Sequence, residues 1–446
     1  MVHALPIICV EPGALDAAGL TPAQQDWARA GGFTGQRGRL LPLPDASGAL
    51  AGYLFGMGDA ANRPKLVVGL AVHGLEAGHY RLEGALGDPT YAALGFKLSA
   101  YRFERYRSAK PAPTLELPAG ADGAEVERLA SAATLARDLV NTPANDMGPE
   151  ALHAEIEAFA KARGMGFKAI VGDDLLAQNF PMIHAVGRAS AQAPRLLDLS
   201  WGDADAPKVT LVGKGVVFDT GGLDIKSAAS MLLMKKDMGG AANVLGLAHA
   251  IVDAGLKVRL RVLIPVVENA ISGSAFRPGD VLASRKGLTV EIGNTDAEGR
   301  LILADAMTLA DEESPDLLLD MATLTGAARV ALGPELPPLY STDDALADEL
   351  MAAGLEADDP LWHMPLWHGY DKDLGSKIAD INNAPGGGFA GSITAALFLK
   401  RFVANAKAWV HLDIYAWAPE ARAGRTQGAT DQAIRAVYGV LKRRFG

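Results

Sequence analysis

The stretch Asn294–Ala306 reads NTDAEGRLILADA and ends in the apolar spacing of a helix. Apolar residues recur at i, i+3, i+4 and i+7, which predicts a helix over 301–310 with one buried face. An apolar run at 288–292 precedes the stretch and predicts a strand. Strand, charged loop and helix in this order form the repeating unit of α/β proteins, whose chemistry usually lies at the carboxyl ends of the strands.

The same alternation continues through the whole second part of the chain, from about residue 200. Nearly continuous apolar strands separated by helices predict a mostly parallel central sheet covered by helices on both faces. The predicted strands are 209–212, 260–267, 288–292, 317–321 and 409–414, and the predicted helices include 241–254 and 301–310.

A chain of 446 residues is too long for one ordinary core, so we expect two domains. The first part carries short strand-like runs such as 66–70 among turns rich in Gly, Pro and Ala. An Ala- and Leu-rich segment, 124–140, predicts a helix that ends before Pro143. We therefore predict a smaller N-terminal α/β domain, 1–118, and a larger catalytic α/β domain, 119–446, that begins with a linking helix within 119–145.

Composition excludes several classes of protein. Hydrophobic residues make up 49% and charged residues 21%, as in globular proteins. A net charge of −10 weighs against nucleic acid as a partner. The single cysteine, Cys9, allows neither an internal disulfide nor a cysteine-based metal site. The N-terminus is a poor signal peptide, and no apolar run reaches the roughly 20 residues of a membrane span, so we expect a cytoplasmic protein without a membrane partner.

The charges of the opening stretch have a structural interpretation and a functional one. Thr295 and Glu298 have the spacing of a capping box, in which their side chains bond free amides at the helix start. That interpretation leaves Asp296 and Arg300 unexplained. Two earlier loops, 213–226 and 231–240, also place carboxylates beside glycines at strand ends or helix starts.

The residues of these loops argue against several familiar catalytic schemes. Asp219-Thr-Gly221 occurs once, whereas an aspartic protease needs two such carboxylates. The chain has no P-loop, no HExxH among its nine histidines and no GxSxG. Carboxylates clustered without His or Cys indicate hard or borderline divalent cations, and several carboxylates suit a pair of them.

Three motifs together resemble the leucyl aminopeptidase family of cytosolic dinuclear-metal aminopeptidases. They are NTDAEGRL at 294–301, GKGVVFDTGGLDIK at 213–226 and MKKDMGGAA at 234–242. Segments 141–145, 323–326, 376–380 and 411–414 also fit, whereas the first part of the chain matches only weakly. The resemblance implies a metallo-exopeptidase, a hydrolase that acts on peptides with a free N-terminus by attack of a metal-bridging hydroxide on the scissile carbonyl. It also implies a homohexamer.

The resemblance implies two divalent ions per subunit, Mn²⁺ or Zn²⁺, and a role for each matching residue. Lysine binds a metal only as the neutral amine, so the pKa of a ligating lysine must fall well below its ordinary value of about 10.4. By this resemblance Asp219 and Glu298 would bridge both ions, Asp296 would complete one site, and Lys214 and Asp237 would complete the other. Lys226 would face the scissile carbonyl, and Arg300 would hold a bicarbonate ion that serves as the general base.

Met234, Thr323 and Gly326 match positions that line the family's first side-chain pocket, and a polarisable methionine suits Leu or Met side chains. Two segments depart from the family pattern, the proline-rich 333–340 and the glycine-rich 382–388, and both bear on the substrate range.

Each of these roles has a simpler alternative. Lys226 could be an exposed loop lysine, Arg300 a salt-bridge partner of Asp296 or Glu298, and Met234 an ordinary core residue. At the level of function, the alternatives are a DNA-binding regulatory member of the same family and a metal-free structural homologue. The net charge weighs against DNA binding, and the intact set of site residues weighs against loss of the metals.

Overall fold

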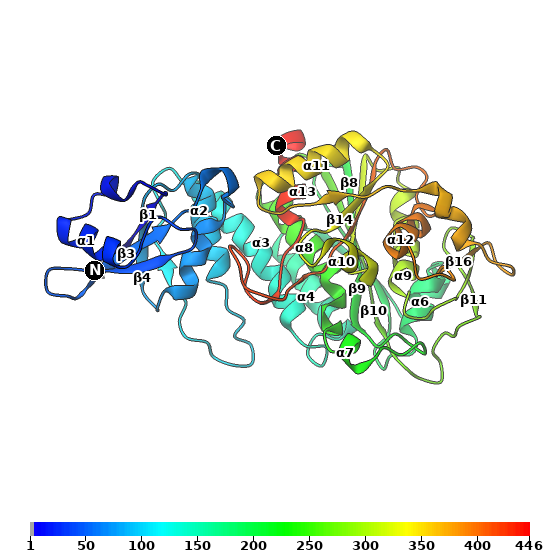
Figure 1. Cartoon of the computed structure of the whole chain (residues 1–446). Coiled ribbons are helices and arrows are strands. Elements are labelled where there is room, and N and C mark those ends of the chain that lie inside the picture. Colours follow the sequence, from blue (N-terminus) through cyan, green and yellow to red (C-terminus); the bar gives the residue numbers. More distant parts are fainter. Residues whose placement is uncertain (1–3) are drawn as a thin grey trace. The chain divides into compact units, whose positions relative to one another are not determined.

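The computed structural model describes residues 4–446, which form two compact units (Figure 1). The first unit contains the chain up to Thr134 together with Ala418–Gly428, and the second contains Leu135–Trp417 and Ala429–Gly446. The boundary between the units falls within helix α3, Gly123–Asn141, whose bounds agree with the predicted helix at 124–140.

The first unit is built on one five-stranded sheet. Its strands are β1 Leu5–Val10, β2 Leu40–Pro44, β3 Leu50–Gly56, β4 His79–Gly84 and β5 Thr114–Leu115, in the spatial order β2-β3-β1-β4-β5. Its helices are α1 Pro22–Ala30 and α2 Pro89–Ser99, with 3₁₀ helices η1 Leu15–Ala17, η2 Ala60–Asn62 and η3 Val67–Gly74. Cys9 lies buried in the core of this unit.

The strand predicted at 66–70 is wrong, because this segment begins η3. A strand with one buried face would bury alternate residues. Here Val67, Val68, Ala71 and Val72 are all buried, which is the spacing of one helical face packed against α2. The short apolar run was ambiguous between strand and helix, and the packing against α2 decides it.

The second unit contains a nine-stranded, mostly parallel sheet. Its strands run in the order β15-β14-β17-β13-β8-β10-β7-β6, and β9 also pairs with β10. Pairing is parallel from β17 through β13 and β8 to β10, and antiparallel where β7 and β6 extend one edge and where β14 joins β17. The strands are β6 Gly166–Val171, β7 Arg195–Trp201, β8 Lys208–Gly213, β9 Gly215–Asp219, β10 Arg259–Asn269, β13 Leu317–Ala322, β14 Pro338–Ser341, β15 Trp362–His363 and β17 Trp409–Asp413.

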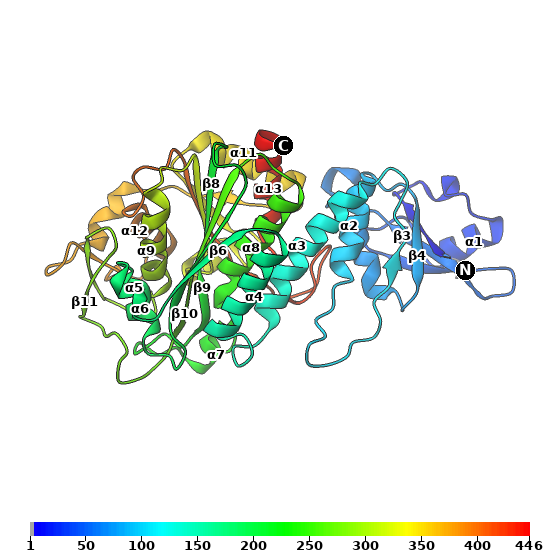
Figure 2. The same ribbon diagram turned by 180° about the vertical axis from the view of Figure 1, so that it is seen from behind.

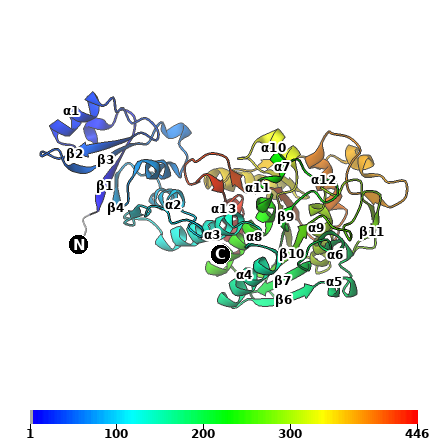
Figure 3. The same cartoon turned by 90° about the horizontal axis from the view of Figure 1, so that it is seen from below.

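Helices cover both faces of this sheet. In Figures 2 and 3, β9 and β10 lie between α8, Gly239–Asp253, on one side and α9, Gly299–Asp311, on the other. Every residue of β13 is buried, as expected for a central strand covered on both faces. The other helices are α4 Pro149–Ala162, α5 Asp174–Ala177, α6 Pro181–Gly187, α7 Ala228–Met231, α10 Gly326–Leu332, α11 Asp344–Glu356, α12 Gly391–Lys400 and α13 Ile434–Phe445, with 3₁₀ helices η4 Met234–Met238 and η5 His368–Leu374.

The predicted two-domain α/β fold is confirmed, although a second predicted strand lies outside the central sheet. The run at 288–292 forms β12, Thr289–Glu291, which belongs to a separate sheet with β11, Val281–Ala283, and β16, Ile381–Asn382. Only Val290 of β12 is buried, so the strand cannot serve as a central one. Two short strands, β18 Trp417–Ala418 and β19 Gly428–Ala429, complete the described elements. None of the described helices is long and apolar enough to cross a membrane.

Candidate metal centre

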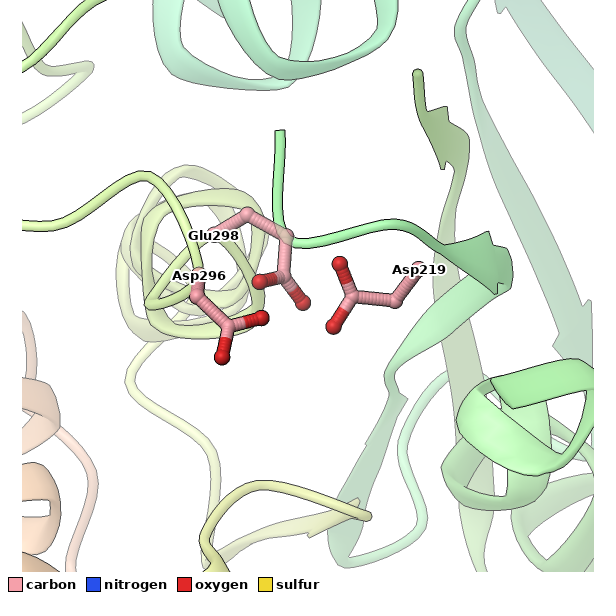
Figure 4. Close-up of side chains that lie close together, drawn as sticks. All are labelled: Asp219, Asp296 and Glu298. Carbon is pink, nitrogen blue, oxygen red and sulfur yellow. The ribbon is translucent and has the colours of Figure 1, made fainter. Parts of the chain in front are cut away.

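Three carboxylates from two distant segments converge in the second unit. Asp219 ends β9, and Asp296 and Glu298 lie in the turn that leads into α9. Figure 4 shows the three side chains pointing toward one another. One oxygen from each lies within 4.8 Å of the others, which is close enough for a shared metal ion.

Lys214 and Asp237 adjoin this cluster. Lys214 lies between β8 and β9, and its Nζ is 2.7 Å from Oδ2 of Asp237 and 3.1 Å from Oε1 of Glu298. The same Nζ donates to the carbonyl oxygen of Thr323 at 3.0 Å. Gly299 leaves room for the lysine, because a Cβ at position 299 would lie 2.5 Å from Cε of Lys214.

Lys226 lies inside the cluster and is not an exposed loop lysine. Its side chain is 13% exposed, its Nζ is 2.7 Å from Oδ2 of Asp219, and it forms a second ion pair with Asp296. Two hydrogen bonds fix the orientation of the Asp219 carboxylate. Its other oxygen, Oδ1, accepts from Nδ2 of Asn269 and from the amide of Gly221, each at 2.8 Å. Lys226 is therefore part of the same cluster as Asp219 and Asp296.

The donor set fits divalent cations. Oδ2 of Asp237, Oδ1 of Asp296 and both carboxylate oxygens of Glu298 are buried, and within the described residues their only charged contacts are with Lys214 and Lys226. Burial, with the charge of Asp219, raises the pKa of Glu298 to about 8 and that of Asp296 to about 6. Carboxyl groups so crowded and so poorly solvated gain most from a bound cation.

The side chains alone hold Lys214 as an ammonium. Burial opposes its charge, but Asp237, Glu298 and Asp219 outweigh burial and raise its pKa above the ordinary value. Ligation through the neutral amine therefore depends on the added positive charge of ions at the same carboxylates. The low pKa expected for a ligating lysine stays a prediction.

Arg300 is buried and is not a salt-bridge strut. Its Nη1 donates to the carbonyl oxygen of Asn383 at 2.6 Å and its Nε has no hydrogen-bond acceptor within the described chain. Over residues 4–446, no carboxylate lies within ion-pair distance of this guanidinium, so the predicted alternative of a pair with Asp296 or Glu298 is wrong. Burial lowers the pKa of Arg300 to about 10, which still leaves it charged at neutral pH.

The predicted capping box does not form. The helix begins at Gly299, with Glu298 at its N-cap and no capping bond from a side chain. Thr295 instead donates through Oγ1 to the carbonyl oxygen of Gly221 at 2.6 Å, and the same Oγ1 accepts the amide of Asp224 at 2.8 Å. The threonine ties the two carboxylate-bearing loops together, and this leaves Glu298 to the cluster.

Two asparagines organise the cluster and were not predicted. Asn383 follows β16, accepts from the amides of Gly293 and Asn294 through Oδ1, and donates through Nδ2 to the carbonyl oxygen of Asn294 at 2.8 Å. Asn269, at the end of β10, donates to Asp219 and also to the carbonyl oxygen of Thr295 at 3.1 Å. Both are at most 1% exposed. A polar residue at the carboxyl end of an apolar strand was the available signal for Asn269.

The three predicted pocket residues lie on the segments beside Asp237. Met234 begins η4, three residues before Asp237, and is only half-buried, so it is not an ordinary core residue. Thr323 is buried, and its Oγ1 is 2.9 Å from Oδ1 of Asp237. Gly326 begins α10 and is exposed.

Comparisons with known proteins agree with the fold. A probable cytosol aminopeptidase of Stenotrophomonas maltophilia is 40% identical over 445 residues, covering 91% of this chain and 90% of that protein. One of Syntrophotalea carbinolica is 41% identical over 367 residues, covering 78% and 73%. The crystal structure of a cytosol aminopeptidase from Coxiella burnetii is 45% identical, covers 100% of this chain and 98% of that one, and has a TM-score of 0.93.

A second solved structure was determined with metal present. The bottromycin maturation enzyme BotP in complex with Mn is 34% identical, covers 99% of this chain and 100% of that one, and has a TM-score of 0.90. Residues 5–118 match the N-terminal domain of M17 aminopeptidases, and residues 134–438 match the catalytic domain of the cytosol aminopeptidase family. The chain therefore belongs to the cytosol aminopeptidase family.

Proposed function

We propose that this protein is a leucyl aminopeptidase-type hydrolase that removes N-terminal residues from peptides with the help of two divalent metal ions per chain. The observation that carries the proposal is the convergence of Asp219, Asp296 and Glu298 with the buried Lys214 and the partly buried Lys226. When bound, two ions would polarise the scissile carbonyl and supply a water-derived nucleophile near neutral pH. Manganese or zinc suits these ligands, and the Mn complex of the similar BotP supports manganese.

The residues of the cluster divide into ligands and groups that meet the substrate. We assign bridging of both ions to Asp219 and Glu298, one site to Asp296, and the other to Lys214 and Asp237. A free substrate amine would join the ion held by Lys214 and Asp237, which accounts for action at the N-terminus only. Met234, Thr323 and Gly326 would line the pocket for the first side chain, with Leu and Met preferred.

Lys226 and Arg300 would act on the reacting groups. Lys226 already faces the oxygens of Asp219 and Asp296, where its ammonium can stabilise the oxyanion of the tetrahedral intermediate. Arg300 has no proton to exchange at working pH, so its part is to hold an anion that does. Its buried guanidinium, which pairs with no carboxylate in residues 4–446, suits bicarbonate, and the bicarbonate would serve as the general base.

The remaining parts of the proposal rest on family resemblance. They are catalysis by residues 119–446, with 119–145 as the linking segment, a homohexamer, and a cytoplasmic location. DNA binding is the rival role, and a salt-dependent gel shift would reveal it.

The proposed function predicts a definite result from metal reloading. The metal-stripped protein should not hydrolyse aminoacyl-p-nitroanilides, and reloading with Mn²⁺ or Zn²⁺ alone should restore hydrolysis of the Leu and Met substrates. N-acetylated Leu-p-nitroanilide, which lacks the free amine, is the matched control and should stay intact. Full activity in protein that elemental analysis shows to be free of metal would overturn the metal dependence.

The bicarbonate assignment has its own test. In a carbonate-depleted assay, added bicarbonate should accelerate the native enzyme, whereas Arg300→Ala should be slow with or without it and keep both ions. The reason is that the variant loses the guanidinium proposed to bind bicarbonate but keeps every proposed metal ligand. If the depleted native enzyme runs at full rate and ignores bicarbonate, the anion role is wrong and a carboxylate of the cluster becomes the better candidate for the base.

A further inference from the structure

Two cations pack over one aromatic ring beside the proposed side-chain pocket. Nζ of Lys236 and Cζ of Arg329 each lie 4.9 Å from the ring centroid of Tyr415. Tyr415 follows β17, and its amide donates to Oε1 of Gln432 at 2.8 Å, which fixes the backbone that carries the ring. Attraction between a cation and a ring face holds both positive groups at this place.

This pair lies next to residues already placed in the pocket. A Cβ on Gly326 would lie 3.8 Å from Nη2 of Arg329, so the guanidinium lies beside this exposed pocket residue. A Cβ on Gly239 would lie 2.5 Å from Ala416 Cβ and 3.0 Å from Thr323 Cγ2. The segment that carries Tyr415 therefore runs beside Thr323, and Lys236 directly precedes Asp237.

Neither cation forms a close ion pair within the described residues. Lys236 is 5% exposed and Arg329 is exposed, yet within residues 4–446 no carboxylate lies at ion-pair distance from either, and neither forms a hydrogen bond. Asp237 and, more weakly, Asp413 attract Lys236 without reaching ion-pair distance. Asp237 is itself paired with Lys214, and the oxygens of Asp413 accept from the amides of Leu324 and Thr325 and from Oγ1 of Thr325. A largely buried lysine that has no close ion pair, beside a permanently charged arginine, would gain from an anionic group that reaches both.

We propose that Arg329 and Lys236 form an acidic-side-chain subsite, so that the enzyme accepts peptides whose N-terminal residue is glutamate or aspartate as well as Leu and Met. The inference rests on the proposed function, because the substrate amine must be held at the ion of Lys214 and Asp237 for its side chain to point past Thr323 and Gly326. Arg329 provides a planar pair of donors for the carboxylate, and an amine such as Lys236 donates in either protonation state.

The test compares two substrates of the same shape. α-Glutamyl- and glutaminyl-p-nitroanilide differ in the charge of the side-chain end, so the ratio of their kcat/KM values isolates recognition of the carboxylate. In the metal-loaded native enzyme this ratio should exceed one. In Arg329→Gln it should fall at least about tenfold, as expected for loss of a charge-assisted pair, and Arg329→Lys should recover part of it. Arg443→Gln, an exposed arginine of α13 paired with Glu356, is the matched control and should leave the ratio as it is.

Other outcomes separate the two proposals. Hydrolysis of the Leu substrate with a Glu/Gln ratio that is unchanged within about twofold in Arg329→Gln would overturn the acidic subsite and leave the aminopeptidase intact. Failure of the metal-loaded native enzyme on every substrate, Leu and Met included, would overturn the proposed function itself. A ratio that falls in Arg329→Gln and also declines with added salt in the native enzyme supports the subsite, because the arginine is exposed to screening.

Discussion

Replacing Glu298 by alanine, or Asp219 by alanine, is expected to lower kcat/KM by at least ~10³-fold, equivalent to about 4 kcal/mol of transition-state stabilisation. Each variant removes a carboxylate assigned to both ions. Glu298 is the stronger case, because both of its oxygens are buried and Lys214 is the cation that pairs with it within the described residues. Elemental analysis of each purified variant should show less than two ions per chain.

A matched variant separates this effect from a general loss of negative charge. Glu312 caps the other end of α9, where its carboxylate is half exposed and pairs with Arg285. Glu312→Ala should keep both ions and its activity. Full metal content in both Asp219→Ala and Glu298→Ala would reject the bridging assignment, whatever happens to the rates.

Replacing Lys226 by alanine is expected to lower kcat by about 10²–10³ and to leave both ions in place, as for loss of one oxyanion donor. The structure sharpens this expectation. Lys226 is ion-paired with Asp219 and Asp296, so its ammonium competes with cations for the same oxygens, and its removal should not weaken metal binding.

The alternative for Lys226 is a structural role in which its ion pairs hold the two loops together. That alternative predicts loss of metal and a lower melting temperature in Lys226→Ala. Lys407→Ala, which removes an exposed lysine paired with Asp316, controls for the change of charge. A change in kcat below about threefold, with both ions bound, would remove Lys226 from the chemistry.

The alternation of apolar strands and helices was sufficient to predict the α/β fold of the second unit. Strands β8, β10, β13 and β17 lie where their apolar runs predicted, since central strands covered on both faces need continuous apolar residues. The segment at 66–70 is not a strand, and the strand predicted at 288–292 forms outside the central sheet, for one reason. Short apolar runs take their conformation and their sheet from tertiary partners that sequence periodicity does not show.

The candidate site was predicted from motifs, and the structure adds what the motifs could not contain. Lys214, Asp219, Asp237 and Glu298 are brought into one cluster, as the motif match implied. The contacts of Asn383 with Arg300 and with residues 293–297 were not predictable, because they join segments about 90 positions apart through backbone groups. The capping role predicted for Thr295 is wrong because the local sequence also fits a capping box, in which the same hydroxyl would have a hydrogen-bond partner.

The fit of Gly299 around Lys214 bears on the order in which such a site can change during evolution. A side chain at 299 would push the end of Lys214 away from its contacts with Asp237 and Glu298, since even a Cβ would lie 2.7 Å from Nζ. A lineage that keeps the amine is therefore held to glycine at 299. In a lineage that first replaces Lys214 by a smaller residue, position 299 can accept a side chain. Lysine can then return at 214 only after glycine has been restored at 299. Positions 214 and 299 are therefore expected to change in a fixed order, with glycine at 299 in place before lysine appears at 214.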